Sequence, residues 1–332
     1  MSKLKAIIFV ETIIILFLIF IILFLVKSPL FPKNHNEYCG SNPQDSNNCL
    51  LSPRIYNEIL KPNSFLILNF NPLRDDIENY IDKNNLDVSV YIENLRTGAS
   101  FGINSSNSYP AVSLNKLPIA VIVLKKVERG EYTLDTKIKI RDYDRNSDFG
   151  NLYFNPVKEL SVRELLHHML AESDNTAAGA LQTDMTQEDL IDLTDYVNYY
   201  SNNISAEHIP ITSTYLTPKT ISNMFASLYL STMLEPENSE LILRELTNTS
   251  FDIKKYANLP SDVVVSQKFG EEYIKDKVYH SCGIIYVSDS RFFYCIMTKD
   301  IDSKKAPEVI GTILNKLYNF IVEKKKVDDF GI

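Results

Sequence analysis

The sequence lacks the motifs of metal and nucleotide chemistry. Its 332 residues include only 4 cysteines and 10 glycines, and they contain no H-E-x-x-H, no paired C-x-x-C and no glycine-rich phosphate-binding loop. Those motifs supply metal ligands or cradle phosphates, so without them we expect no metal and no cofactor. Positive charge is not in excess either: the net charge is −8, and the lysines are scattered apart from the run at 324–326. This balance argues against a nucleic-acid partner.

One long apolar run is present at residues 6–26, where only Glu11 and Thr12 are polar. A run of about 20 residues is long enough to cross a bilayer. It continues into Lys27-Ser28-Pro29 rather than into a small-residue cleavage site, which favours an uncleaved anchor over a signal peptide. We expect residues 1–5 to form a short cytoplasmic tail, residues 6–26 a transmembrane helix, and the Pro- and Asn-rich residues 27–63 a juxtamembrane linker.

The four cysteines fall into two pairs. Cys39 and Cys49 flank a polar loop, whereas Cys282 and Cys295 lie on two apolar runs separated by Ser288-Asp289. A two-residue hairpin turn there would place position 282 opposite position 295. A disulfide is then geometrically possible in each pair, and two buried free thiols at 282 and 295 are an equal alternative.

Residues 64–332 have the pattern of one α+β domain. Periodicity predicts helices at 72–85, 114–128, 161–171, 175–183, 187–199, 218–233 and 305–324, and strands at 87–94, 99–104, 262–270, 282–288 and 291–299. This order favours an antiparallel sheet flanked by helices, with a mainly helical subdomain inserted between the strands. The sequence shows no internal repeat.

Ser113 and Lys116 are the first candidate catalytic pair. At positions i and i+3 of a helix, two side chains share a face, so the amine could reach the hydroxyl and activate it as a nucleophile. The S-x-x-K pattern is common by chance, and the sequence at Ser2–Lys5 matches it too. The pair therefore needs support from its surroundings.

A rival nucleophile is Ser100 in the G-x-S-x-G match at 98–102. That nucleophile elbow requires a strand, a sharp turn and then a helix. Here the match lies at the start of a strand in a predicted hairpin, and residues 103–110 show no helical pattern. We therefore disfavour Ser100.

Two further motifs support Ser113. They are Ser173-Asp174-Asn175 and, on a predicted strand, Lys268-Phe269-Gly270. With the first motif they resemble the S-x-x-K, S-D-N and K-T-G triplet of penicillin-recognising serine enzymes. The surrounding segments are similar to the class A β-lactamase group from about residue 72 to about residue 325, including YPAVSLNKLPIAVIVLKKVERGEYTLDTKI, SVRELLHHMLAESDNTAAGAL, TPKTISNMFASLYL and KFGEEYIKDKVYHSCGIIYV.

The resemblance implies a β-lactamase/transpeptidase-like fold and an acyl-enzyme mechanism. Ser113 would attack a carbonyl, with Lys116 as the proton acceptor. That amine must then spend time neutral, which partial burial and the nearby charge of Lys268 favour. Ser173 would relay the proton to the leaving nitrogen, while Lys268 would polarise Ser173 and attract an anionic group of the substrate.

The resemblance also implies the substrate-binding groups. Asn175 would hydrogen-bond the substrate amide, and Gly270 and Glu271 would line the site at the third motif. The backbone N–H groups of Ser113 and Glu271 would form the oxyanion hole. Taken as residues alone, Asp174 and Asn175 also suit a helix cap, which is compatible with the catalytic reading.

Two features depart from the family's pattern. Phe269 stands where the third motif usually has Thr or Ser, so a hydroxyl that helps to bind the substrate carboxylate is missing. The region 201–218 lacks the E-x-x-L-N with which class A β-lactamases position the deacylating water, and Glu207 is its only acid.

Three hypotheses follow. The favoured one is an acyl-serine enzyme that acts on β-lactam or cell-wall peptide amide bonds and turns β-lactams over poorly. The second is a genuine β-lactamase that deacylates through another base, with Glu207 or Glu172 as candidates. The third is an inactive β-lactam- or peptidoglycan-binding module, which is disfavoured as a sensor because five residues before the predicted span leave no room for an output domain.

These hypotheses also locate the domain. The lysines on the two sides of residues 6–26 are nearly balanced, so the positive-inside rule does not decide the orientation. Because β-lactams and cell-wall peptides are met outside the cytoplasm, we expect the catalytic domain on the extracytoplasmic side of the cell membrane. We expect a monomer.

Overall fold

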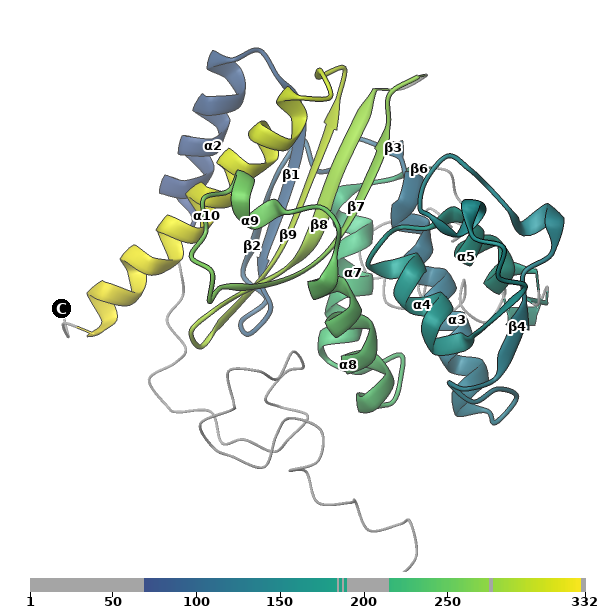
Figure 1. Cartoon of the computed structure of the whole chain (residues 1–332). Helices are drawn as coiled ribbons and strands as arrows, with labels where there is room; N and C mark the ends of the chain where they lie inside the picture. The colour runs from purple at the N-terminus through teal and green to yellow at the C-terminus, as the bar shows by residue number, and fades with distance from the viewer. Residues whose placement is uncertain (1–68, 184, 187, 190–214, 275–276, 330–332) are drawn as a thin grey trace, which may run out of the picture. The chain divides into compact units, whose positions relative to one another are not determined.

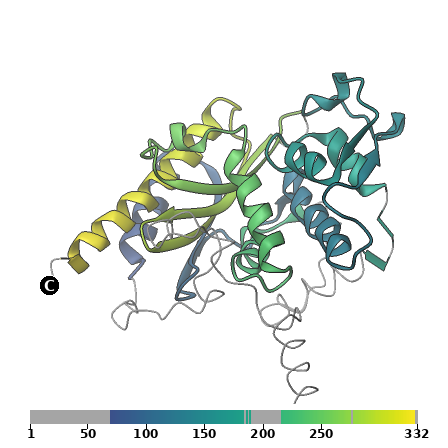
Figure 2. The ribbon, with the colours of Figure 1, turned by 60° about the horizontal axis from the view of Figure 1, so that its bottom comes forward.

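The computed structural model describes residues 69–183, 185–186, 188–189, 215–274 and 277–329, with side chains as far as residue 323. A five-stranded antiparallel sheet with strand order β2-β1-β9-β8-β7 lies at its centre (Figure 1). The strands are β1 (Asp87–Asn94), β2 (Ser100–Ile103), β7 (Val264–Glu272), β8 (Val278–Val287) and β9 (Ser290–Lys299). Strand β7 is an edge of this sheet, and a block of helices formed by residues 116–182 lies beside it (Figures 1 and 2). We call it the helical block.

Helices cover both faces of the sheet. On one face lie α2 (Asn71–Lys83), α9 (Ile253–Tyr256) and α10 (Lys305–Asp329), and on the other lie α7 (Pro218–Tyr229) and α8 (Pro236–Glu245). Phe225 of α7 meets Phe293 of β9 with ring centroids 5.5 Å apart. Because both faces are covered, every residue of β8 is buried, which explains its nearly continuous apolar sequence.

The helical block between β2 and β7 carries two of the three motifs. It comprises α3 (Lys116–Glu128), α4 (Val162–Leu170), α5 (Asn175–Gln182) and the hairpin of β4 (Lys137–Lys139) and β5 (Glu159–Ser161). Helix α4 begins with a capping box in which Ser161 and Glu164 bond each other's backbone N–H. The short strands β3 (Tyr109–Pro110) and β6 (Tyr215–Leu216) pair where the chain enters and leaves the block.

The predicted fold class is confirmed, and several element boundaries are corrected. The helix expected at 114–128 is a 3-10 turn, η5 (Val112–Asn115), followed by α3. The helix expected at 218–233 ends at Tyr229, because Ser231 adopts a positive φ of 50°. Helices α8 and α9 were not predicted. Each nevertheless begins at a local signal, Pro236 in the first turn of α8 and the Asp252 cap of α9.

Several expectations fall on residues that are not described. They are the anchor at 6–26, the linker, the Cys39/Cys49 pair and nearly all of the helix expected at 187–199. Within the described ranges, none of the helices has the length and apolar character needed to cross a membrane.

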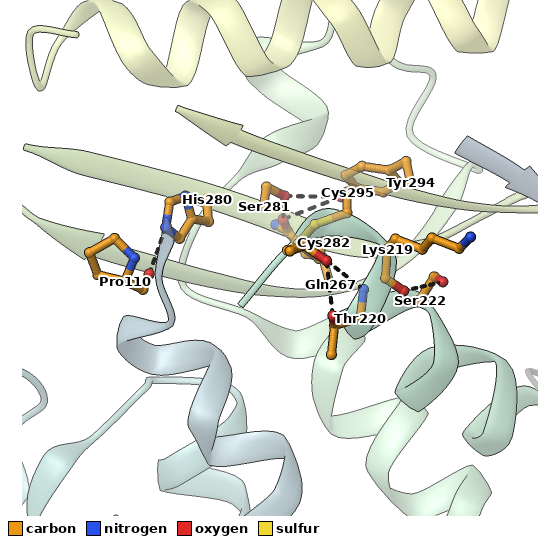
Figure 3. Close-up of a disulfide and its surroundings, with 11 residues drawn as sticks. Pro110, Lys219, Thr220, Ser222, Gln267, His280, Ser281, Cys282, Tyr294 and Cys295 are labelled. Atoms are coloured by element: carbon orange, nitrogen blue, oxygen red, sulfur yellow. Dashed lines mark hydrogen bonds between the residues drawn. A yellow bond between two sulfur atoms is a disulfide. The ribbon is translucent and has the colours of Figure 1, made fainter. Parts of the chain in front are cut away.

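The hairpin predicted at Ser288-Asp289 is confirmed. Val287 pairs with Ser290, and Cys282 therefore faces Cys295 with Cα atoms 4.0 Å apart. The two form a disulfide, which settles the alternative that the sequence left open (Figure 3). Cys282 is also the cross-strand partner of Lys268 on β7, so the bridge lies directly beside the third motif.

The disulfide should contribute to stability. The double variant Cys282→Ala, Cys295→Ala should lose about 2–4 kcal/mol of unfolding free energy, because the bridge restricts the unfolded chain. Denaturant titration of the full-length chain checks this, and the wild type in strong reductant should show the same loss. A wild type that is equally stable with and without reductant would contradict the bridge.

Candidate active site

Ser113 lies in a constrained turn beside the sheet edge. Val112, which precedes it, has a φ of 42°, a left-handed conformation that is rare for a β-branched residue. A Cβ added to Gly270 on β7 would lie 2.5 Å from Val112 Cγ2 and 3.1 Å from the Ser113 nitrogen. Glycine in the third motif therefore allows the strand to approach the backbone of the serine turn.

Lys116 contacts the serine of the first motif and both Ser173 and Asn175 of the second. Its Nζ is 3.2 Å from Ser113 Oγ, 3.2 Å from Ser173 Oγ and 2.5 Å from Asn175 Oδ1. It also donates to the Ser173 carbonyl. The side chain reaches these groups from the first residue of α3, and it is only 5% exposed.

Lys268 reaches the same serine from the sheet. Its Nζ lies 2.8 Å from Ser173 Oγ and 2.9 Å from the Phe269 carbonyl, and it sits 4.4 Å from the centroid of the Phe269 ring. The side chain has no exposed surface. Ser173 Oγ is thus bracketed by two amines, one from the helical block and one from β7.

Burial lowers the pKa of both lysines. For Lys116 the pKa falls from 10.5 to about 7, against the opposing effect of the Asp174 charge. For Lys268, complete burial lowers the pKa well below its ordinary value, and the positive charge of Lys116 lowers it further. Near neutral pH a substantial fraction of Lys116 is therefore neutral and able to accept a proton.

The Ser173-Asp174-Asn175 segment is held by its neighbours. Ser173 has a φ of 58°, and Asp174 caps α5 by accepting the Ala177 N–H at 2.9 Å. The second oxygen of Asp174 accepts the N–H of Leu152 at 2.9 Å. The helix-cap reading of Asp174 is confirmed, and the cap directs the side chain of Asn175 toward Lys116.

The loop at residues 146–149, which carries no recognisable motif, hydrogen-bonds to Asn175. The backbone N–H of Asn175 donates to the Phe149 carbonyl at 3.0 Å, and its Nδ2 lies 3.3 Å from Asn146 Oδ1. The Asn146 N–H donates in turn to Thr176 Oγ1 at 3.0 Å. Nothing in the local sequence distinguishes this loop from others, since its role depends on a contact across about 30 residues.

Phe269 packs into the core instead of offering a hydroxyl. It is 3% exposed, and its ring lies 5.6 Å from Phe149 and 5.8 Å from Phe251. Two residues on, Glu271 is half-buried, and burial raises the pKa of its carboxyl, against the opposing effects of Tyr273 and Lys268. Lys268 is therefore followed by a core aromatic residue, a buried glycine and a half-buried acid.

Two other candidates, Ser100 and Glu172, are not part of this hydrogen-bond network in the described structure. Ser100 begins β2 in the β1–β2 hairpin, with no helix after it, as expected. The Glu172 carboxylate bonds His168 Nδ1 at 2.8 Å, and within the described part of the chain it makes no hydrogen bond to Ser113 or the two lysines. Glu207 lies outside the described residues. Among the side chains that are described, no cluster of His, Cys, Asp and Glu could hold a metal.

Comparison with known proteins shows the family of the chain. A model of the β-lactamase enzyme family matches residues 72–321. The chain belongs to this family. Its members are serine hydrolases, and the chain is therefore assigned to that class of enzyme. The match spans all three motifs and both the sheet and the helical block.

Two curated relatives are distant and cover most of the chain. A protein of Phocaeicola vulgatus named beta-lactamase is 24% identical over 244 residues, 68% of this chain and 74% of that protein. Beta-lactamase VEB-1 of Pseudomonas aeruginosa is 22% identical over 275 residues, 75% of this chain and 90% of that protein.

Solved structures share the fold. PBP-A superposes with a TM-score of 0.65 at 19% identity, covering 76% of this chain and 97% of PBP-A. The extended-spectrum β-lactamase TLA-3 also superposes with a TM-score of 0.65 at 19% identity, covering 76% of this chain and all of TLA-3. At this identity the likeness establishes the fold alone.

The low pKa of Lys116 predicts the pH dependence of Ser113. The rate of covalent labelling by a fluorophosphonate should rise as the pH increases through about 7, because below that value Lys116 is protonated and cannot accept the serine proton. Gel fluorescence at pH 5.5 to 8.5 measures the rate. Lys116→Arg, which does not deprotonate, should be slow throughout. A flat profile in the wild type would rule out Lys116 as the titrating base.

Proposed function

We propose that the chain is an acyl-serine hydrolase that acts on β-lactam or cell-wall peptide amide bonds through Ser113. The observation that carries this proposal is the convergence of Ser113, Lys116, Ser173 and Lys268 within hydrogen-bond distances. A serine next to an amine whose pKa is near 7 is an activated nucleophile, and a second hydroxyl held between two amines can relay a proton.

The acylation step follows from this geometry. Ser113 Oγ attacks the substrate carbonyl carbon and forms the new C–O bond, while its proton passes to neutral Lys116 Nζ. The C–N bond then breaks. Ser173 Oγ gives its proton to the leaving nitrogen and regains one from Lys116, which lies 3.2 Å away. Lys268 orients the Ser173 hydroxyl throughout.

The substrate would be held at the edge of β7. Asn175 has its amide beside Lys116, where it can bond the substrate amide. The backbone N–H groups of Ser113 and Glu271 are the proposed donors to the carbonyl oxygen, and Gly270 leaves the space between them. Water must then attack the acyl-enzyme to release the acid and free Ser113.

We propose that this last step is slow for β-lactams. In the described part of the chain, no carboxylate bonds to Ser113 or Lys116, and Phe269 offers no hydroxyl to a substrate carboxylate. The alternative, a genuine β-lactamase with a different deacylating base, draws support from the relatives that carry that name. Covalent trapping of a β-lactam has a parallel in a PBP-A variant, solved as an acyl-enzyme complex with penicillin G, which is similar at 20% identity and a TM-score of 0.64.

We also propose that residues 6–26 anchor the enzyme in the cell membrane, with the catalytic domain on the extracytoplasmic side and acting as a monomer. The apolar run supports the anchor, and the proposed substrates support its orientation.

Labelling with a fluorescent penicillin tests the nucleophile. The full-length wild type should form a covalent adduct, Ser113→Ala should form none, and the matched control Ser100→Ala should label normally. A chromogenic cephalosporin should be turned over slowly. Fast turnover would favour the β-lactamase alternative, and no adduct with either penicillin or a fluorophosphonate would favour an inactive binding module. Labelling that survives Ser113→Ala would overturn the assignment.

Phe269 should limit the recognition of anionic substrates. Phe269→Thr should raise the ratio of penicillin to fluorophosphonate labelling by about tenfold, since a hydrogen bond to a charged group contributes about 1.5–3 kcal/mol. Phe269→Val is the control, because it removes the ring and adds no hydroxyl. Both variants should be destabilised by a few kcal/mol through the cavity left in the core. Equal ratios for the two variants would show that the hydroxyl is not what is missing.

A further inference from the structure

His280 is a buried histidine outside the four residues of the proposed reaction. It lies on β8 with no exposed surface, and its Nε2 is 2.9 Å from the carbonyl oxygen of Pro110 (Figure 3). The two residues are separated by 170 positions in the sequence. Because a carbonyl only accepts, Nε2 must carry the proton, and the imidazole is the donor.

The acceptor belongs to the segment that leads into the nucleophile. Pro110 ends β3, and Ala111 and the left-handed Val112 separate it from Ser113. A β-branched residue holds such a conformation only where its surroundings impose it. The contacts made by β3 therefore decide whether the Ser113 turn keeps its shape.

Other sheet residues hold β3 in the same place. Tyr109 OH lies 2.8 Å from Ser89 Oγ and 3.3 Å from Asp87 Oδ1, both on β1. The Tyr109 ring meets the His280 ring edge-on, with centroids 5.7 Å apart. Strand β3 is thus fastened to the sheet by side chains of β1 and β8.

His280 and Gly270 act on the turn as a cross-strand pair. They are direct partners in the β7–β8 ladder. Gly270 lets the backbone at Val112 and Ser113 come close, and His280 holds the carbonyl of Pro110, just before that backbone. One cross-strand pair therefore allows β7 to lie close to Val112 and Ser113 and also hydrogen-bonds the residue at which this turn begins, Pro110.

The ring is suited to a constant role as a donor. Burial lowers the pKa of His280 to about 4, against the opposing effect of its bond to Pro110, so the imidazole stays neutral at physiological pH. The group of the proposed reaction that titrates near neutrality is Lys116, whose pKa is about 7. In the described structure, His280 makes no hydrogen bond to Lys116 or to Lys268.

We propose that His280 is a positioning residue for Ser113, which acts through its hydrogen bond to the Pro110 carbonyl. The inference rests on the proposed function of Ser113. It predicts a loss in the rate of the covalent step and leaves the noncovalent binding of the reagent unchanged.

The test compares three variants of the full-length chain with a fluorophosphonate as reagent. His280→Met removes the donor at similar volume, and His280→Gln keeps an N–H donor near the position of Nε2. Ser266→Ala is the matched control, because it removes another buried bond to a backbone carbonyl, that of Leu243 at 2.8 Å, in the same sheet. The maximal labelling rate and the half-saturating concentration are measured separately, with thermal stability in parallel.

We expect His280→Met to lower the maximal rate about 10- to 100-fold with little change in the half-saturating concentration, as a displaced nucleophile should. His280→Gln and Ser266→Ala should stay within about threefold of the wild type. A normal rate in His280→Met, an equal loss in Ser266→Ala or a failure of His280→Gln to restore the rate would each overturn the proposal.

Hydrogen exchange separates this inference from the proposed function. Amides of residues 111–116 should exchange faster in His280→Met than in Ser266→Ala, whether or not Ser113 reacts. If the wild type is not labelled but exchange rises as expected, the proposed function fails and the support of the turn by His280 stands. If labelling is normal and exchange is unchanged in His280→Met, the positioning role of His280 is wrong and the proposed function of Ser113 stands.

Discussion

Two buried lysines share the hydroxyl of one serine, and the remaining parts of the site are arranged around this contact. Lys116 approaches Ser173 from the helical block, and Lys268 approaches it from the sheet edge. Burial lowers the pKa of both amines, and the positive charge of Lys116 lowers that of Lys268 further. The neutral amine that a serine nucleophile requires is therefore a consequence of packing.

This contact requires a particular fold, because Lys116 and Lys268 are more than 150 residues apart in the sequence. The sheet must present β7 as an edge strand, and the helical block must present α3 and the start of α5 against it. The close approach at Gly270 and the left-handed residues Val112 and Ser173 are the local conformations that this meeting requires. Backbone conformations of this kind concentrate at functional sites.

The neighbouring strand β8 carries a disulfide and a buried polar bond beside that edge. Cys282 pairs with Lys268 across β7 and β8, and its bridge to Cys295 links β8 to β9. Two residues along the ladder, Gly270 and His280 face the serine turn. Within three residues of β8, a covalent bond to β9 and a buried hydrogen bond to Pro110 thus lie next to the edge strand β7.

Much of the fold was predictable because its signals are local. Alternation and apolar runs identified β1, β8 and β9, and the spacing of Val309, Ile313 and Leu317 identified α10. The three motifs were also legible as residue types, and the turn at Ser288-Asp289 set the register that brings the two cysteines together. Helices α8 and α9 were missed, although Pro236 and Asp252 mark their starts.

Local sequence patterns were enough to predict the α+β architecture, the family resemblance and the two lysines and two serines of the candidate site. The convergence of these groups, the core position of Phe269 and the hydrogen bonds of Asn146 and His280 became visible only in the folded chain. The reason is physical. Local periodicity reports which face of an element is buried, whereas the pKa of Lys116 and the donor for Pro110 depend on contacts between segments far apart in the chain.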